Sequence, residues 1–184
     1  MALRHRNPGI RPRLTLGARL DHAARAGFPA TCTVLAMLLT QAPFGIPGQA
    51  AILPAVTLAC VWFWSLFRPA AMAPPAVFAI GLLLDLLGYL PLGVGVLMLL
   101  LAHGIARRWR RFLAQQGFAM TWVAFLPVGG GAALLTWALV VALTLKANPP
   151  GLALFQAVLT GALYPVLAIP LAWLHRAVAE ADAT

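Results

Sequence analysis

The fold is decided by one stretch of sequence, FAIGLLLDLLGYLPLGVGVLMLLL, at residues 78–101. It is apolar almost throughout, yet it contains one carboxylate, Asp85, and a run of turn-forming residues from Gly88 to Gly93. A charge at the centre of a bilayer costs roughly 2.5–3.5 kcal/mol on insertion scales, so a carboxylate in these surroundings requires an explanation. The break three residues later indicates a tight hairpin of two helices, with Asp85 one turn before the bend.

The composition of the chain is that of a membrane protein. Hydrophobic residues make up 62% of it and charged residues 9%, against about 45–50% and about 25% in ordinary soluble domains. Several apolar runs approach the roughly 20 residues that a membrane-spanning helix needs. We therefore predict an all-α integral membrane protein, and little polar sequence is left over for a soluble lobe.

The net charge of +9 is explained by orientation in a membrane rather than by nucleic acid. The arginines stand outside the apolar runs, as in the positively charged cytoplasmic loops of membrane proteins. Ten of them form a group before the first run and a group between two later runs: Arg4, Arg6, Arg11, Arg13, Arg19, Arg25, Arg107, Arg108, Arg110 and Arg111. We predict that the second group anchors the chain to anionic lipid headgroups, and we predict no nucleic-acid partner.

Apolar runs and breaks divide the chain into six predicted spans, at about residues 28–44, 49–67, 70–87, 92–106, 118–145 and 151–174. The fourth is short for a bilayer crossing and can continue into residues 107–113. With both termini cytoplasmic, every arginine falls on one side and the loops on the other side contain only Lys146. The predicted organisation is a basic cytoplasmic segment at 1–27, a six-helix membrane domain at 28–176 and a short cytoplasmic tail at 177–184.

The flanks of the first two spans allow more detailed predictions. Residues 14–26 are either a short amphipathic helix on the membrane surface or a disordered tail. The charged head is longer than that of a signal peptide, so we expect the first span to be retained. Trp62 and Trp64 are expected in an interfacial aromatic belt, and Arg68-Pro69 ends the second span.

Asp85 allows two hypotheses. It is an intramembrane polar anchor for a partner helix, an ion or a substrate, or its carboxylate caps the free amides at the start of the fourth span, where a negative charge is favourable. The nearby glycines, Gly81, Gly88, Gly93 and Gly95, are best explained by close helix approach and by the bend. Pro91 suits the start of the fourth span, where its missing amide proton matters little.

The fifth span is predicted to be broken internally by Pro127 and by the glycines at 129–131. Broken helices bind substrate in many transporters, but a solute site needs several convergent polar groups. The polar residues of this region are spread out along the sequence: Thr121, Thr136, Thr144, Gln156, Thr160 and Tyr164. We therefore expect the break to be a tight packing point between backbones.

Catalysis, metal binding and cofactor binding have no support in the sequence. Neither a nucleophile with a neighbouring base nor paired carboxylates can be assembled, and the glycine run lacks the lysine of a phosphate-binding loop. The histidines are scattered singly without ligand spacing. Cys32 and Cys60 fall in apolar runs and are expected to be small core residues. We predict a protein without catalytic residues, metal or cofactor.

One region resembles a known family. The pattern F-x-x-G-L-L-L-D-L-L-G-x-x-P-L-G at residues 78–93 is similar to the hallmark segment of the MreD family, the rod-shape-determining membrane proteins of bacteria. The preceding W-x-x-x-R-P, formed by Trp64, Arg68 and Pro69, also resembles that family's pattern. The similarity covers about residues 62–111; the arginine-rich head and the triple glycine do not match it.

The resemblance implies a non-enzymatic scaffold in the bacterial cytoplasmic membrane. Such a scaffold would act in cell elongation with the single-pass partner MreC and, through it, with MreB filaments and the peptidoglycan synthases. The residues implied for structure or partner contact are Trp64, Arg68, Pro69, Gly81, Asp85, Gly88, Pro91 and Gly93. The implied fold is similar to the substrate-binding subunits of energy-coupling-factor transporters. A small-molecule-binding subunit of a membrane transporter is therefore the alternative function, and a small lipid-handling channel is a third.

Overall fold

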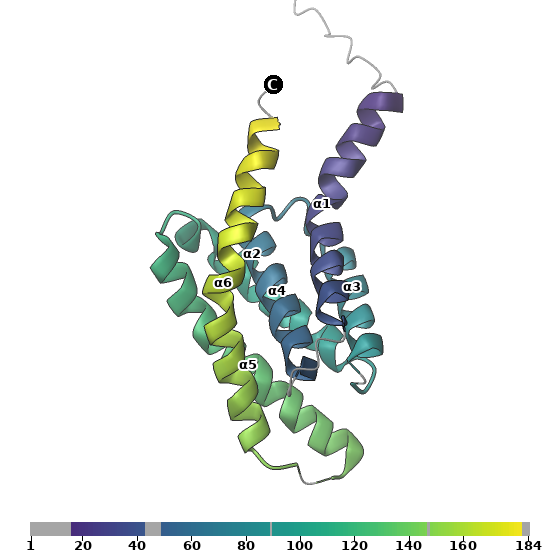
Figure 1. Ribbon diagram of the computed structural model, residues 1–184, viewed down its shortest axis with the longest axis vertical. Coiled ribbons are helices and arrows are strands. Elements are labelled where there is room, and N and C mark those ends of the chain that lie inside the picture. Colours follow the sequence, from purple (N-terminus) through teal and green to yellow (C-terminus); the bar gives the residue numbers. More distant parts are fainter. Residues whose placement is uncertain (1–15, 43–48, 89, 147, 182–184) are drawn as a thin grey trace, which may run out of the picture.

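The structure is a computed structural model that describes residues 16–42, 49–88, 90–146 and 148–181. These residues form helices and their connections and no strand, so the predicted all-α class is confirmed for them. Figure 1 shows the elements, which are α1 (Leu16–Thr40), the short 3₁₀ helix η1 (Gln49–Ala51), α2 (Ile52–Phe67), α3 (Pro74–Leu87), α4 (Val94–Leu113), α5 (Phe118–Thr144) and α6 (Gly151–Ala181).

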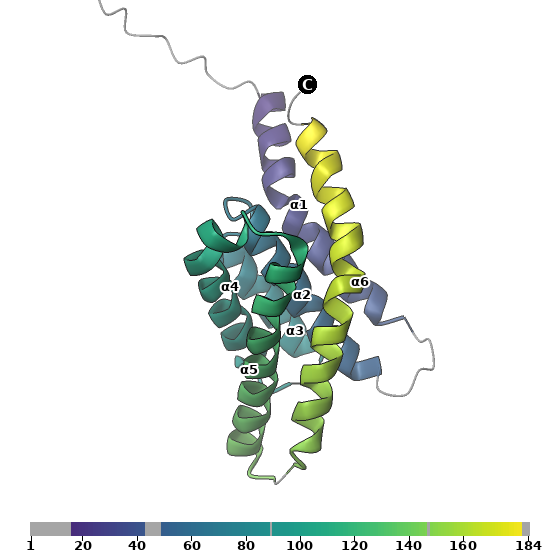
Figure 2. The same cartoon turned by 90° about the vertical axis from the view of Figure 1, so that its left-hand side faces the viewer.

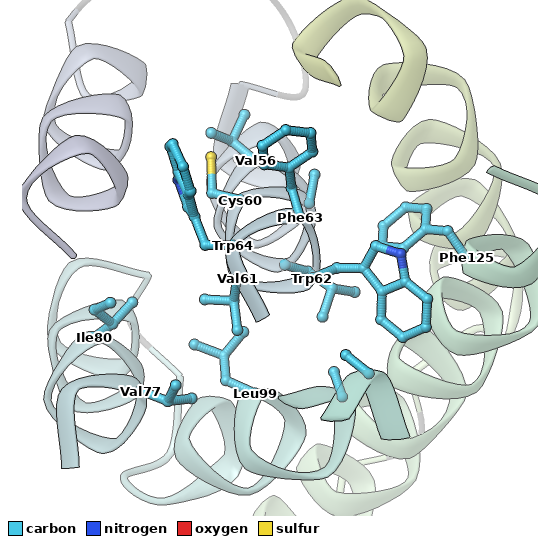
Figure 3. Close-up of a cluster of buried hydrophobic side chains, with 14 of the residues drawn as sticks. Val56, Cys60, Val61, Trp62, Phe63, Trp64, Val77, Ile80, Leu99 and Phe125 are labelled. Atoms are coloured by element: carbon cyan, nitrogen blue, oxygen red, sulfur yellow. The ribbon is translucent and has the colours of Figure 1, made fainter. Parts of the chain in front are cut away.

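The core is built around α2. Thirteen of its 16 residues are buried, because its sequence contains no charged residue and presents an apolar surface in every direction. Figure 3 shows α2 side chains pointing outward toward neighbouring helices, where Ile80 of α3, Leu99 of α4 and Phe125 of α5 meet them. The bundle therefore closes around one central helix.

The prediction that Trp62 and Trp64 form an interfacial belt is wrong. Their side chains are 1% and 0% exposed. Trp62 lies against the ring of Phe125, with centroids 5.9 Å apart, and Trp64 packs edge-on against Phe28 at 6.0 Å and against Phe63 at 5.3 Å. Both indoles are core residues because α2 is covered on all sides.

The helix connections fall into two groups at opposite ends of the molecule. Figures 1 and 2 show α1 beginning and α6 ending at one end, with the α2–α3 and α4–α5 connections toward it. The α3–α4 hairpin and the α5–α6 connection lie toward the other end. The arginines at 107–111 and the turn at 90–92 thus lie at opposite ends of α4, whose 20 residues extend about 30 Å. The structure thus separates them along one helix, and their placement on opposite sides of a membrane stays a prediction.

Three helical segments are long and apolar enough to cross a membrane among the described residues: Gln49–Phe67, Phe118–Thr144 and Gly151–Ala177. The apolar parts of α1 and α3, Gly27–Thr40 and Pro74–Leu87, are shorter. Each has 14 residues and a length of about 21 Å, below the roughly 30 Å of a hydrocarbon core. These helices reach spanning length only together with adjoining residues.

Several predicted helix boundaries are corrected. Residues 16–26 belong to the same continuous helix as the first predicted span, so they form neither a separate surface helix nor a tail. The third helix begins at Pro74 rather than at residue 70, because prolines fit the first helical positions. The last helix continues past residue 174 to Ala181. As predicted, α4 continues through the arginines to Leu113.

The predicted break in α5 is also wrong, since the helix runs without interruption from Phe118 to Thr144 with Pro127 inside it. One narrow face of α5 is buried, and Gly129 belongs to it. A Cβ added at Gly129 would lie 3.2 Å from the Thr160 methyl group of α6, so this glycine is a tight packing point, against a side chain rather than a backbone. Nothing lies within 4 Å of such a Cβ at Gly130 or Gly131.

Candidate functional site

The hairpin between α3 and α4 is closed by the carboxylate of Asp85. Asp85 lies in the last turn of α3 and is 1% exposed. The backbone N–H of Gly93 donates to its Oδ2 at 2.8 Å, and that of Gly95 donates to its Oδ1 at 2.6 Å. One side chain of α3 therefore holds two backbone amides at the start of α4. We call this arrangement the Asp85 clasp.

The clasp follows from the requirements of a helix start. The first amides of a helix lack partners within it, and the helix dipole favours a negative charge there. Gly93 occupies the N-cap position with φ at 98°, a left-handed conformation that suits glycine. Since glycine has no side chain to cap the helix, Asp85 supplies the acceptor from the neighbouring helix. The capping hypothesis for Asp85 is confirmed.

Glycines allow α3 and α4 to approach closely beside the clasp. A Cβ added at Gly81 would lie 2.6 Å from the Cα of Val96, which is fixed backbone. A Cβ added at Gly95 would lie 2.5 Å from Asp85 Oδ1. Small residues at such positions let helix backbones meet in membranes. The close approach predicted for these two glycines is therefore confirmed.

Gly88 and Pro91 complete the turn. Gly88 ends α3, its N–H donating to the Leu84 carbonyl at 2.8 Å, with an ordinary right-handed conformation. The Pro91 carbonyl accepts from the Val94 N–H at 3.2 Å. Pro91 precedes the first helical residue by three positions, so the prediction that it starts the helix is wrong. The reason is that Gly93 and the Asp85 carboxylate form the cap instead.

The other residues implied by the family resemblance lie at the far end of α3 from the clasp. Trp64 is in the core, and Arg68 ends α2, its N–H donating to the Trp64 carbonyl at 2.8 Å. The Arg68 carbonyl accepts from the N–H groups of Ala71 and Met72, both at 3.1 Å, and Pro69 lies in this turn. The structure thus gathers these residues into two groups rather than one site.

The four predicted lipid anchors lie on the last two turns of α4. Arg107, Arg108, Arg110 and Arg111 are all exposed. Arg110 and Arg111 fall in the last helical turn, where positive charge is favourable with the helix dipole. The exposed side chains of Trp109 and Phe112 stand among the arginines. This end of α4 carries a cationic and aromatic surface.

Sequence reasoning missed a buried polar pair between α2 and α4. Ser65 and His103 are 0% and 3% exposed, and Ser65 Oγ lies 2.7 Å from His103 Nδ1. A serine beside a histidine contradicts the prediction that no nucleophile with a neighbouring base can be assembled. The serine hydroxyl, however, donates to the Val61 carbonyl at 2.5 Å. A serine has one hydroxyl proton, so the direction of the Ser65–His103 hydrogen bond depends on the imidazole tautomer.

The buried position of this pair indicates a structural contact between α2 and α4. Neither side chain reaches the surface, and His103 Nε2 is buried without a partner among the described residues. The two residues stand 38 positions apart. Each is a single polar residue in an apolar run. This isolation is the feature of the sequence that could have indicated a buried polar contact.

A pocket of about 250 Å³ lies between α2, α4, α5 and α6, toward the hairpin end. It brings together Thr136, Gln156 and Thr160, three of the polar residues that were predicted to be spread out, so that part of the prediction is wrong. The amide nitrogen of Gln156 donates to the Ala51 carbonyl at 3.0 Å and to Thr160 Oγ1 at 3.3 Å. Apolar side chains form most of the remaining wall.

Thr136, Gln156 and Thr160 all have partners within the protein. The Thr160 hydroxyl donates to the Gln156 carbonyl at 2.7 Å, and the Thr136 hydroxyl approaches the Met98 sulfur at 3.5 Å. Within the described ranges no three metal-ligating side chains lie together. Comparisons with protein-family models, with curated proteins and with solved structures find no match to this chain.

Proposed function

We propose that this protein is a non-enzymatic scaffold of the bacterial cell-elongation machinery in the cytoplasmic membrane, as the resemblance to the MreD family implies. In this proposal it binds the single-pass protein MreC and helps to couple MreB filaments to peptidoglycan synthesis. The partner supplies the connection to the filament and to the synthases, and this protein supplies a rigid membrane base.

The Asp85 clasp is the observation that carries the proposal. Of the motif that resembles the family's hallmark, Asp85 accepts from the Gly93 N–H in the clasp, and Gly81 lets α3 approach the α4 backbone at Val96. The two carboxylate oxygens are engaged by backbone amides inside the bundle. A motif built in this way fixes the shape of the α3–α4 hairpin, and a scaffold requires such a fixed shape. The acidic group of Asp85 is used to hold the hairpin.

The proposed topology has six spans with both termini in the cytoplasm. Three helices have spanning length on their own. In this proposal α1, α3 and α4 cross as well, with their adjoining residues and with local thinning of the bilayer to match their apolar length. The end of the molecule that carries Arg68, the arginines of α4 and Arg176 faces the cytoplasm, as the positive-inside rule requires.

Depletion of the protein in its bacterial host tests the proposed function. Rod-shaped cells should become round, and an affinity-tagged copy should restore the rods and co-purify with a single-pass membrane protein. A tagged Asp85→Leu copy, in which the clasp is lost, should restore shape poorly and retain less partner. Unchanged rods after depletion below detection would refute the scaffold, provided that the protein is normally present under the same growth conditions.

A solute-binding subunit of a transporter is the second candidate, because the pocket joins Thr136, Gln156 and Thr160 within an apolar wall. Ligand sites combine such walls with a few placed polar groups. Mass spectrometry of the gently purified protein distinguishes the two candidates. A stoichiometric small molecule that is lost in Gln156→Leu, together with normal cell shape on depletion, would establish the transporter subunit in place of the scaffold.

A further inference from the structure

A second depression, apolar throughout, runs along the side of the molecule between α4 and α5. Its space is about 330 Å³. Leu101 and Ile105 of α4 form one wall, Pro127 of α5 lies opposite, and the buried residues Ala102 and Ala132 form the floor. It stays open at Gly131, where an added Cβ would meet nothing within 4 Å. We call this depression the α4–α5 groove.

The groove is in register with the cationic end of α4. Residues three, four and seven positions along a helix share a face. From Ile105 this spacing leads to Arg108, Trp109 and Phe112, which are all exposed. Arg110 is five positions from Ile105, so it lies on the opposite side of the helix. A single face of α4 thus passes from an apolar groove to a guanidinium flanked by aromatic rings.

We propose that the α4–α5 groove binds one anionic phospholipid of the cytoplasmic leaflet. Its acyl chain lies in the groove, its phosphate contacts Arg108, and Trp109 stands at the level of the headgroup. Basic sites between membrane helices on the cytoplasmic side bind anionic headgroups, and tryptophan is enriched at the interface. The inference uses the membrane orientation in the proposed function but does not depend on the scaffold role.

Charge complementarity favours a lipid over a partner's helix as the occupant. Neither α4 nor α5 contains an aspartate or a glutamate, so neither helix offers Arg108 a carboxylate. An occupant that matches this face combines an apolar body along residues 98–105 with a negative group at the arginine end. A phospholipid has both in one molecule, and an arginine contacts a phosphate through paired hydrogen bonds.

Two matched pairs of variants test the site. Gly131→Leu places a side chain in the groove, and Gly130→Leu makes the same change outside the groove lining; an added Cβ has open space at both. Arg108→Gln removes the charge in register with the groove, and Arg110→Gln removes an equal charge from the other side of α4. Both glycine changes favour the helix, so a loss of binding in Gly131→Leu would not result from lower helix stability.

The measurement is photolabelling of the purified full-length protein in vesicles of phosphatidylcholine. The vesicles contain a small fraction of phosphatidylglycerol with a photoreactive group midway along one acyl chain. Labelled peptides should come from residues 98–105 and 127–135. Labelling should fall about fivefold in Arg108→Gln, as expected for one basic contact near the membrane surface, and at least as far in Gly131→Leu. It should change less than twofold in the two controls.

Equal labelling of all variants, or labelling spread evenly over the helices, would overturn the lipid site. Equally strong labelling by a phosphatidylcholine probe would also overturn it, since the proposal needs the negative headgroup. A cross-link from position 131 to a single-pass protein, with no lipid label there, would assign the groove to a partner helix instead. Because the experiment uses purified protein in vesicles, its result is independent of whether depletion changes cell shape.

Discussion

The carboxylate of Asp85 occupies the position that an N-cap side chain usually has, but it comes from the preceding helix. Its two bonds to backbone amides, at 2.6 and 2.8 Å, are charge-assisted. This contact could be predicted from the sequence, because a turn of a few residues necessarily brings the end of one helix beside the start of the next. The contact between Ser65 and His103 could not, since the two residues are 38 positions apart and meet only through the packing of α2 against α4.

Substitutions at Asp85 should separate the capping role from the acidity of the group. Asparagine keeps one acceptor oxygen but turns an N–H donor toward a backbone amide, so we expect Asp85→Asn to destabilise the protein by about 1–3 kcal/mol. Leucine removes both acceptors, and Asp85→Leu should cost more. Thermal unfolding in detergent measures both. If Asn and Leu are equally destabilising, the clasp is not the source of the stability.

Burial of Trp64 predicts a loss of stability that an interfacial tryptophan would not show. Trp64→Ala removes a side chain of 0% exposure and should lower the free energy of unfolding by about 3–5 kcal/mol. Trp173, which is 74% exposed, is the matched control, and its alanine variant should change stability far less. Similar unfolding midpoints for both variants would contradict the burial of Trp64 in the core and would favour a position at the membrane interface.

At the scale of helices, the crossing of α3 and α4 is fixed by backbone proximity. The hairpin of α3 and α4 could be predicted from the sequence, because glycines, a proline and one acidic residue stand at the turn. The same reasoning gave a wrong result for α5, where Pro127 and the neighbouring glycines suggested a break. A proline removes one backbone donor, and helices of membrane proteins tolerate this loss through local backbone adjustments. Pro127 itself is exposed, and the residue types alone do not distinguish a tolerated proline from a break.

Alanine substitutions of glycine test the crossing directly. A methyl group at Gly81 meets the Val96 backbone at 2.6 Å, so Gly81→Ala should force α3 and α4 apart and cost about 1–3 kcal/mol. Gly104 has nothing within 4 Å of an added Cβ, and Gly104→Ala should stabilise α4 by up to about 1 kcal/mol. Unfolding midpoints in detergent compare the two. A stabilising Gly81→Ala would contradict the close approach.

At the scale of the whole molecule, the charges are segregated by the order of the helices. The ends of α2, α4 and α6 that carry arginines lie toward one end of the molecule, and the α5–α6 connection, which contains Lys146, lies toward the other. This arrangement could be predicted because each helix reverses the direction of the chain. The pocket and the α4–α5 groove could not, since the pocket depends on the tilt and spacing of four helices and the groove on those of two. The central position of α2 could not be predicted either. Its sequence without charged residues is compatible with burial on all sides but does not require it.

Accessibility of two engineered cysteines tests the central claim, that the hairpin and the arginines of α4 face opposite sides of a membrane. With Cys32 and Cys60 replaced by alanine, Leu92→Cys stands in the exposed hairpin turn and Gln115→Cys follows the arginine end of α4. A membrane-impermeant maleimide should label Leu92→Cys in intact spheroplasts and Gln115→Cys only after permeabilisation. Labelling of both cysteines from the same side of the intact membrane would contradict the account.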